Sequence, residues 1–241
     1  MNRLAKGIVC ASIGVASATA SAGFTANYVG YGLFESHMVG YSTALSWDSA
    51  ASVTMFNLKL AEHKWTLNGE TTYTWCAQLY QGVTAGNNYY FDTVALEQAP
   101  QTPPAPGPMG VGRATVLRDA MSRFLQSDGR VASGLGSATA ATAALCALSW
   151  EIIHENFNTQ DAETVRSRID LSKGAFRTVL SGESAAIFAA MVSNIGNGGY
   201  RDVAAEGWTS PTAQDQFRMV PTPGSLAILG LAGIAALRRR R

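Results

Sequence analysis

The sequence predicts an α+β domain with a β-rich N-terminal half, a sandwich or barrel, and a helical subdomain after it. We also expect a signal peptide before the domain and a short C-terminal transmembrane sorting helix after it. Two observations predict this class. Alternating polar and apolar runs with turn signals occupy residues 53–91, and Ala-rich runs with helical periodicity occupy residues 114–195. Strands and helices are segregated along the chain, which argues against a parallel βαβ sheet. The intervening segment, 23–219, is long enough for one domain with a substantial core.

The expected strands are short runs with two-residue alternation or with β-branched and aromatic side chains, at residues 53–60, 63–67, 73–80 and 89–91. Asn68-Gly69 is a strong signal for a tight hairpin turn after the second run. Residues 100–108 contain five prolines, which predicts an extended connector.

The expected helices span residues 114–126, 137–157 and 183–195, and glycines after residue 195 end the last one. On the longest helix, four large or sulfur-bearing side chains recur at helical spacing and share one face: Cys146, Trp150, Ile153 and Phe157. Residues 165–171 alternate apolar and charged side chains, which predicts one more strand between the helices.

The first 22 residues have the layout of a secretory signal peptide. Arg3 and Lys6 provide a positive start and an apolar stretch follows. Ala20 and Ala22 are the small residues that signal peptidase requires, so cleavage is predicted before Gly23. An ordinary N-terminal helix is the alternative, but an acid-free opening rich in Ala and Ser favours the signal.

The C-terminus has three consecutive parts that together predict a removable sorting signal. A proline-containing motif is followed by an apolar run at 225–237 and a basic cluster: Val220, Pro221, Thr222, Pro223, Gly224, then Arg238, Arg239, Arg240 and Arg241. The apolar run is shorter than the roughly 20 residues of a standard spanning helix. Terminal arginines hold their end in the cytoplasm and leave the preceding chain outside. A basic tail without structure would not explain the apolar block.

The motif Val-Pro-x-Pro-Gly-Ser-Leu-Ala-x-Leu-Gly-Leu-x-Gly followed by arginines resembles the PEP-CTERM sorting signal of Gram-negative and related bacteria. The resemblance implies processing by signal peptidase and by an exosortase-type membrane transpeptidase. It also implies a place in the cell envelope, held at the membrane by the C-terminal segment, or in the exopolysaccharide matrix of a biofilm after release. Thr222 stands where the family has glutamate, so this chain departs from the motif at one position.

Charge argues against nucleic acid as a partner. Six of the 18 basic residues and none of the 17 acidic ones lie in the two terminal signals, which leaves the segment between them with a net charge of −5. Nucleic acids and anionic lipid surfaces select basic patches instead.

Two cysteines, Cys76 and Cys146, remain after Cys10 leaves with the signal peptide. In an oxidising compartment an even pair is usually a disulfide, and closing a loop of this size contributes about 4 kcal/mol in the chain-entropy model. Two separately buried thiols, each acting as a small apolar residue, are the alternative.

The surroundings of both cysteines are similar to bacterial thioester domains. Trp75-Cys76-Ala77-Gln78-Leu79 resembles the aromatic-Cys-x-x-Leu strand of those domains. Residues 143–153 resemble their helix, in which a glutamine stands four residues before Trp150. In the family, the cysteine thiol and that glutamine condense to an internal thioester that amines can attack. Here Cys146 occupies the glutamine position and has no carboxamide. The resemblance therefore implies a domain without a thioester, with a Cys76–Cys146 disulfide in its place.

A hydrolase is disfavoured. Residues 182–186 resemble a nucleophile elbow around Ser184, but the second glycine is absent and all three histidines, His37, His63 and His154, precede the serine. Ser184 fits better in the first turn of a helix.

Other polar and aromatic groups have ordinary interpretations. His154 lies between Glu151 and Glu155 on the long helix without a second histidine at metal-ligand spacing, so no metal is expected and a solvated helical face is predicted. Tyr200 and Trp208, in and after a Gly- and Asn-rich loop, are candidates for stacking on sugars, and core burial is the preferred interpretation.

The sequence thus predicts a non-enzymatic exported surface protein, structural or adhesive, without a cofactor. A carbohydrate-binding module for exopolysaccharide is the second interpretation, and exposed aromatic residues on one face would favour it. A secreted hydrolase is the third, and it would need a histidine and a nucleophile together in a cleft.

Overall fold

The computed structural model describes residues 23–42, 44–48, 53–102, 106–157 and 161–220. The predicted signal peptide and the apolar and basic parts of the predicted sorting signal lie outside these ranges. Within them, no helix combines the length and the apolar character needed to cross a bilayer.

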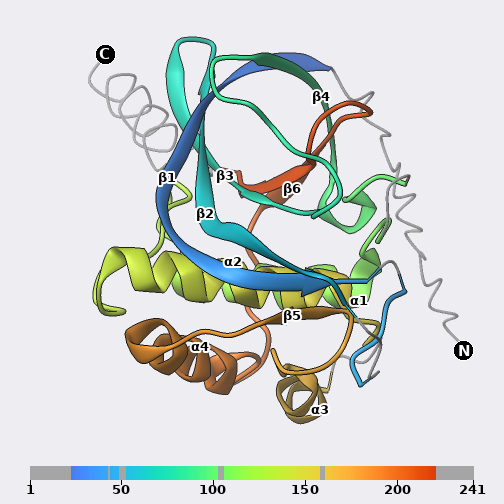
Figure 1. Ribbon diagram of the computed structural model, residues 1–241, viewed down its shortest axis with the longest axis vertical. Coiled ribbons are helices and arrows are strands. Elements are labelled where there is room, and N and C mark those ends of the chain that lie inside the picture. The colour runs from blue at the N-terminus through green and yellow to red at the C-terminus, as the bar shows by residue number, and fades with distance from the viewer. Residues whose placement is uncertain (1–22, 43, 49–52, 103–105, 158–160, 221–241) are drawn as a thin grey trace, which may run out of the picture.

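The described chain forms seven strands and four α-helices (Figure 1). The strands are β1 Phe24–Tyr41, β2 Met55–Leu67, β3 Glu70–Cys76, β4 Asn88–Ala95, β5 Phe176–Thr178, β6 Ala205–Thr209 and β7 Gln216–Met219. The helices are the 3₁₀ turn η1 Leu96–Gln98, followed by α1 Gly110–Phe124, α2 Ala138–His154, α3 Ala162–Arg168 and α4 Gly182–Asn194.

Six strands close into an antiparallel barrel in the order β1-β2-β3-β7-β6-β4, because β1 pairs with both β2 and β4. Strand β5 pairs with the far end of β1 outside this ring. The α+β class is confirmed, and of the two β-architectures the structure has the barrel. The strands do not all come from the first half, however: β6 and β7 insert between β3 and β4.

The long strand β1 was not expected, and it organises the barrel. Its first residues pair with β4, its last with β5, and most of its length with β2. Shifts in register between Tyr28 and Gly30 and between Tyr31 and Phe34 bend the strand around the barrel. These bulges break the two-residue alternation, so the sequence pattern does not indicate a strand here.

The hairpin between β2 and β3 has the predicted turn. Asn68 and Gly69 both adopt positive φ, at 53° and 83°. Two such residues in succession match the twist of the flanking strands and fix their register, which pairs Leu67 with Glu70. The two predicted strands before the turn are one continuous strand, β2.

Helix α2 packs against β1 and β2 and lies between α1 and α4 (Figure 1). Ser137 caps its start, accepting a 3.3 Å hydrogen bond from the backbone N–H of Ala140. Nearly all of its side chains are buried, as expected for a core helix. The predicted helix is confirmed but ends at His154, so Cys146, Trp150 and Ile153 lie on it and Phe157 lies beyond it. All four residues are buried.

The predicted strand at 165–171 is wrong, since residues 162–168 form helix α3. The Asp161 carboxylate accepts a 2.8 Å hydrogen bond from the backbone N–H of Thr164, which satisfies a free donor of the first turn. Only Val165 of this short helix is buried. The alternation of apolar and charged residues at 165–171 therefore does not mark the buried face of a strand. The strand in this region is β5, at Phe176–Thr178.

The molecule has two hydrophobic clusters. The larger one joins the helices to one end of the barrel, so the helices share a core with the barrel instead of forming a separate subdomain. The smaller one fills the barrel with aromatic side chains around Tyr28, Trp65, Phe91 and Trp208. The predicted burial of Trp208 is confirmed, and Tyr200 is partly buried.

Candidate functional site: two thiols between the barrel and helix α2

Cys76 is the last residue of β3 and faces the inside of the barrel. Successive side chains alternate across a strand, and Thr74 accepts a 2.8 Å hydrogen bond from the indole of Trp65 in the barrel interior. Trp75 points the other way, donating a 3.0 Å hydrogen bond to the carbonyl of Gly129. The Cys76 thiol donates to the carbonyl of Gln78 at 2.6 Å.

Cys146 reaches the same place from helix α2. The Cys146 thiol forms a hydrogen bond with the backbone of Ala61 in β2. The register pairs Glu62 with Trp75, and its continuation by one residue places Ala61 opposite Cys76. One helical turn later, the Trp150 indole donates a 2.9 Å hydrogen bond to the carbonyl of Cys76. The structure thus brings the two cysteines into one hydrophobic cluster.

Both cysteines are free thiols in the structure, and both are buried. Burial raises the pKa of Cys76 well above its ordinary value, and the neighbouring Cys146 raises it further. Burial likewise raises the pKa of Cys146 to about 12. The nucleophilic form of cysteine is the thiolate, and burial disfavours that form at both residues. The disulfide stays a prediction.

Two phenols lie close to the thiols. Burial raises the pKa of both Tyr28 and Tyr31, and the charge on ionised Cys76 adds to the effect at each ring. The Tyr28 hydroxyl is buried, and the Tyr28 and Tyr31 side chains interact through a hydrogen bond. Tyr31 is 41% exposed, so it is the member of this group that meets solvent.

The polar residues of α2 correct the sequence interpretation, because Glu151, His154 and Glu155 are buried and not solvated. Glu151 accepts a 2.8 Å hydrogen bond from the backbone N–H of Asp170. Glu155 accepts hydrogen bonds from the N–H groups of Ala175 and Phe176, at 2.9 and 3.1 Å. The two carboxyl groups therefore hold the segment between α3 and β5 against α2.

Burial raises the pKa of Glu151 well above its ordinary value, and Glu155 raises it further. Burial also raises the pKa of Glu155 to about 8. Burial lowers the pKa of His154 to about 4, which keeps the imidazole neutral. The nearby buried cation, Arg113, donates to carbonyl oxygens of Met109, Pro108 and Ile153 and so caps the C-terminus of α2. These groups form a structural network between helices and loop.

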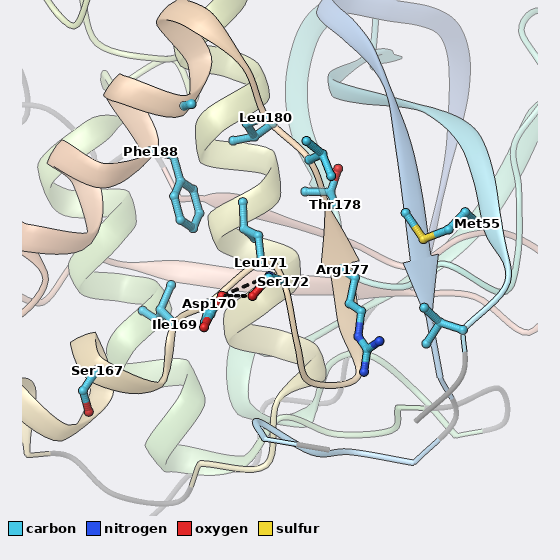
Figure 2. Close-up of a pocket in the computed structure, with 13 residues that line it drawn as sticks. Met55, Ser167, Ile169, Asp170, Leu171, Ser172, Arg177, Thr178, Leu180 and Phe188 are labelled. Atoms are coloured by element: carbon cyan, nitrogen blue, oxygen red, sulfur yellow. Dashed lines mark hydrogen bonds between the residues drawn. The ribbon is translucent and has the colours of Figure 1, made fainter. Parts of the chain in front are cut away.

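The segment held by the two glutamates forms one wall of a pocket of about 840 Å³ (Figure 2). Its lining is mostly apolar, with Met55, Leu171 and Phe188 around the cavity and the Asp170–Ser172 turn at one side. Asp170 is engaged by Ser172, whose N–H and hydroxyl donate to it at 3.0 and 2.6 Å. The described lining contains no histidine and no cysteine, so it supplies no nucleophile–base pair.

Ser184 lies in the first turn of α4, as predicted, and its hydroxyl donates to the carbonyl of Ser181 at 3.0 Å. The three histidines lie apart from one another. His37 is hydrogen-bonded to Glu35 and to the carbonyl of Val179. The ring of His63 packs against the tyrosine rings of the barrel, and His154 is hydrogen-bonded to the carbonyl of Trp150. Within the described ranges, no group of three or more His, Cys, Asp or Glu residues is arranged to hold a metal ion.

Two residues of the predicted processing signals lie within the described chain. Gly23 directly precedes β1, and the N–H of Val220 donates to the carbonyl of Ala204 at 2.8 Å after β7. The other predicted signal residues lie outside the described ranges: Ala20, Ala22, Pro221, Thr222, Pro223, Gly224, Arg238, Arg239, Arg240 and Arg241.

Comparison with known proteins adds no identification, because no family model, no curated protein and no solved structure matches this chain.

Proposed function

We propose that this chain is a non-enzymatic exported protein with a structural or adhesive role, sorted through signal peptidase and an exosortase-type transpeptidase to the cell envelope or matrix. One observation carries the non-enzymatic part: Cys146 lies in one core cluster with Cys76, at the helix position where the resembled thioester domains have glutamine. A thiol supplies no acyl carbon, so these two residues cannot form a thioester.

The positions of the outer strands support the processing part. Strand β1 begins at Phe24, one residue after the proposed cleavage site, and β7 ends at Met219, just before the proline motif. Removal of both signals would therefore leave every strand of the barrel complete. A protein that is cut at both ends after export needs this independence of the fold from its signals.

Export would also set the state of the thiols. In an oxidising compartment a thiol oxidase would remove two electrons and two protons from Cys76 and Cys146 and leave one sulfur–sulfur bond. The bond would connect strand β3 to helix α2. Disulfides of this kind act mainly by restricting the unfolded chain.

The experiment is the intact mass of the protein purified from the envelope, before and after reduction under denaturing conditions. The proposal expects a chain that begins at Gly23, lacks the arginine tail and gains two hydrogens on reduction. Detection of two free thiols would contradict the proposed disulfide but would not affect the proposed processing of the two ends. A chain that keeps residues 1–22 or 238–241 would contradict the proposed processing at that end.

A matched pair of variants separates disulfide from thioester chemistry. In Cys146→Gln the Cys76 sulfur could bond to the carboxamide carbon as the carbon–nitrogen bond breaks, and the thiol proton would leave with ammonia. If the thioester resemblance is right, the measured mass of Cys146→Gln is one ammonia below the mass calculated from its sequence. The measured mass of Cys146→Ser equals its calculated mass. Loss of ammonia from the unsubstituted protein would contradict the proposal, because it would reveal a thioester to another glutamine.

A further inference from the structure

A groove of about 660 Å³ is lined by residues of β4, β6 and the segment that follows β4. We define the β4–β6 groove by its lining: Asp92, Val94, Glu97, Gln98, Gln101, Pro108 and Thr209. The register pairs Thr93 with the buried Trp208, so Asp92 and Val94 on either side of Thr93 face outward. The groove therefore uses the outer surface of the barrel.

The far wall of the groove is held tightly against the barrel at Gly207. A Cβ atom at this position would lie 2.4 Å from the Cβ of Ala99, which is closer than two carbon atoms can pack. The backbone N–H of Gln101 donates a 2.6 Å hydrogen bond to the buried carboxylate of Asp215. Contacts on both sides of Pro100 thus fix the segment that carries Gln98 and Gln101.

Four side chains in the groove keep hydrogen-bonding capacity. Among the described residues, the side chains of Gln98, Gln101 and Thr209 have no protein hydrogen bond, and Asp92 accepts only from the Tyr90 hydroxyl, at 3.3 Å. A carboxylate, two carboxamides and a hydroxyl together supply both acceptors and donors. Neighbouring hydroxyl groups on a sugar each donate and accept, and so they complement this set.

Tyr90 provides an apolar surface beside these groups. Its side chain is 53% exposed, more than any other exposed aromatic residue in the described part of the chain. Its hydroxyl lies over Gly23, where a Cβ atom would be 1.6 Å away, and it bonds Asp92 of the groove. The ring is thus fixed next to the groove with an open face, on which the C–H groups of a pyranose can pack.

Charge selects the class of ligand. Glu97 is neutralised by Arg118 at 2.6 Å, whereas Asp92 has no ion-pair partner within the described ranges. The segment between the proposed signals carries a net charge of −5. An anionic polysaccharide would be repelled by this groove, and a neutral one would not.

We propose that the β4–β6 groove binds a neutral polysaccharide, with Tyr90 packed on one sugar ring and with Asp92, Gln98 and Gln101 bonded to its hydroxyls. Concave sites with a few convergent polar groups and an aromatic wall are typical of small-molecule and sugar binding. This inference extends the proposed surface role, and it relies on that role only for the setting in which the polysaccharide is met.

The test uses the mature protein and the exopolysaccharide of the producing cells, separated by ion exchange into neutral and anionic fractions. Isothermal titration calorimetry against the neutral fraction is expected to show binding that weakens at least about tenfold in Tyr90→Ala and in Asp92→Ala, the loss that one broken contact of about 1.4 kcal/mol produces. Phe56→Ala is the control, because Phe56 is also exposed, at 46%, and lies on β2 outside the groove.

The outcomes are distinct. No binding to the neutral fraction overturns the proposal, and so does binding that Tyr90→Ala and Asp92→Ala leave unchanged. Stronger binding to the anionic fraction would overturn the assigned ligand class. The unfolding temperatures of all three variants are measured in parallel, since surface substitutions are expected to leave them nearly unchanged. Calorimetry on purified protein does not depend on how the protein is sorted in the cell. The sugar-binding proposal can therefore fail while the intact-mass experiment supports the proposed processing, and the reverse is also possible.

Discussion

The indole N–H of Trp150 donates a hydrogen bond to the backbone carbonyl of Cys76 at 2.9 Å. Both residues are buried, and the bond joins helix α2 to the end of β3 across 74 positions of the chain. It satisfies a carbonyl at the place where β3 leaves the sheet, and it holds Cys146, one helical turn earlier, beside that strand end. This contact therefore positions the two thiols relative to each other.

Trp150→Phe is expected to lower the free energy of unfolding by about 1–3 kcal/mol. The substitution keeps most of the apolar volume but leaves the buried carbonyl of Cys76 without its donor, and an unsatisfied buried acceptor costs about this much. Urea unfolding followed by circular dichroism measures the change. Tyr90→Phe removes a hydroxyl at the surface and serves as the control, with an expected change within about 0.5 kcal/mol.

The buried Glu155 is expected to make the domain less stable as the solution becomes alkaline. Burial raises its pKa from 4.5 to about 8, and nearby Asp48 acts in the same direction. Hydrogen bonds from Phe176 and Ala175 and the charge of Arg177 oppose the rise. Because the folded pKa is above the unfolded one, the folded state favours the protonated acid. The protonated Glu155 side chain therefore contributes fully to the stability of the folded domain below about pH 4.5, and this contribution is lost as pH rises through about 8.

The measurement is the unfolding free energy of the native chain and of Glu155→Gln from pH 5 to 9. Glutamine keeps an oxygen for the two backbone N–H groups and does not titrate, so the variant is expected to show a flatter profile. Glu151 contacts the same segment between α3 and β5 and also has a raised pKa. The variant Glu151→Gln measures how much of the pH dependence comes from Glu151. Equal slopes in all three proteins would contradict the assignment of the pH dependence to these carboxyl groups.

Asp119 is expected to be the most sensitive charged residue on α1. Its buried carboxylate accepts hydrogen bonds from Arg123 at 2.9 Å and from the N–H groups of Gly196 and Arg201, both at 2.7 Å. Asp119→Ala removes one partner of an almost fully buried ion pair, which costs about 3–5 kcal/mol. Thermal unfolding measures the loss, and hydrogen exchange is expected to increase selectively at residues 196–201. Asp128→Ala, at an exposed turn, is the comparison.

Gly69→Ala is expected to destabilise the β2–β3 hairpin by about 1 kcal/mol. The residue has a φ of +83° in open space, so the penalty comes from the backbone conformation and not from a clash. Gly82→Ala is a matched control, because Gly82 also has open space around it but lacks a positive φ. Similar chemical-denaturation midpoints for the two variants would show that the turn conformation does not limit stability.

Local features could be predicted from the sequence, because the residues concerned interact with close neighbours in the chain. The Asn68-Gly69 turn, the start of α2 at Ser137 and the end of α4 before Gly196 each depend on a few adjacent residues. The aligned face of α2 also follows from helical spacing alone. For this reason the class of the domain and the placement of Cys146 and Trp150 on one buried face agree with the structure.

The strand pairings could not be predicted in the same way. Strands β6 and β7 enter the barrel between β3 and β4, although more than 100 residues separate them from either one. They are only five and four residues long, so they show little periodicity. Strand β1 contains two irregularities that interrupt its alternation. Which strands become neighbours depends on the closure of the barrel, which no local window of sequence contains.

By itself, the sequence determined the α+β class, the hairpin turn, the central helix and the chemical identity of the two cysteines. Only the tertiary structure decided which polar groups are buried. Glu151, His154 and Glu155 have the sequence of a solvated helical face, yet all three are buried. The segment between α3 and β5 donates backbone hydrogen bonds to the two glutamates. Burial depends on what other segments pack against a residue, and spacing along a helix indicates only which residues share a face.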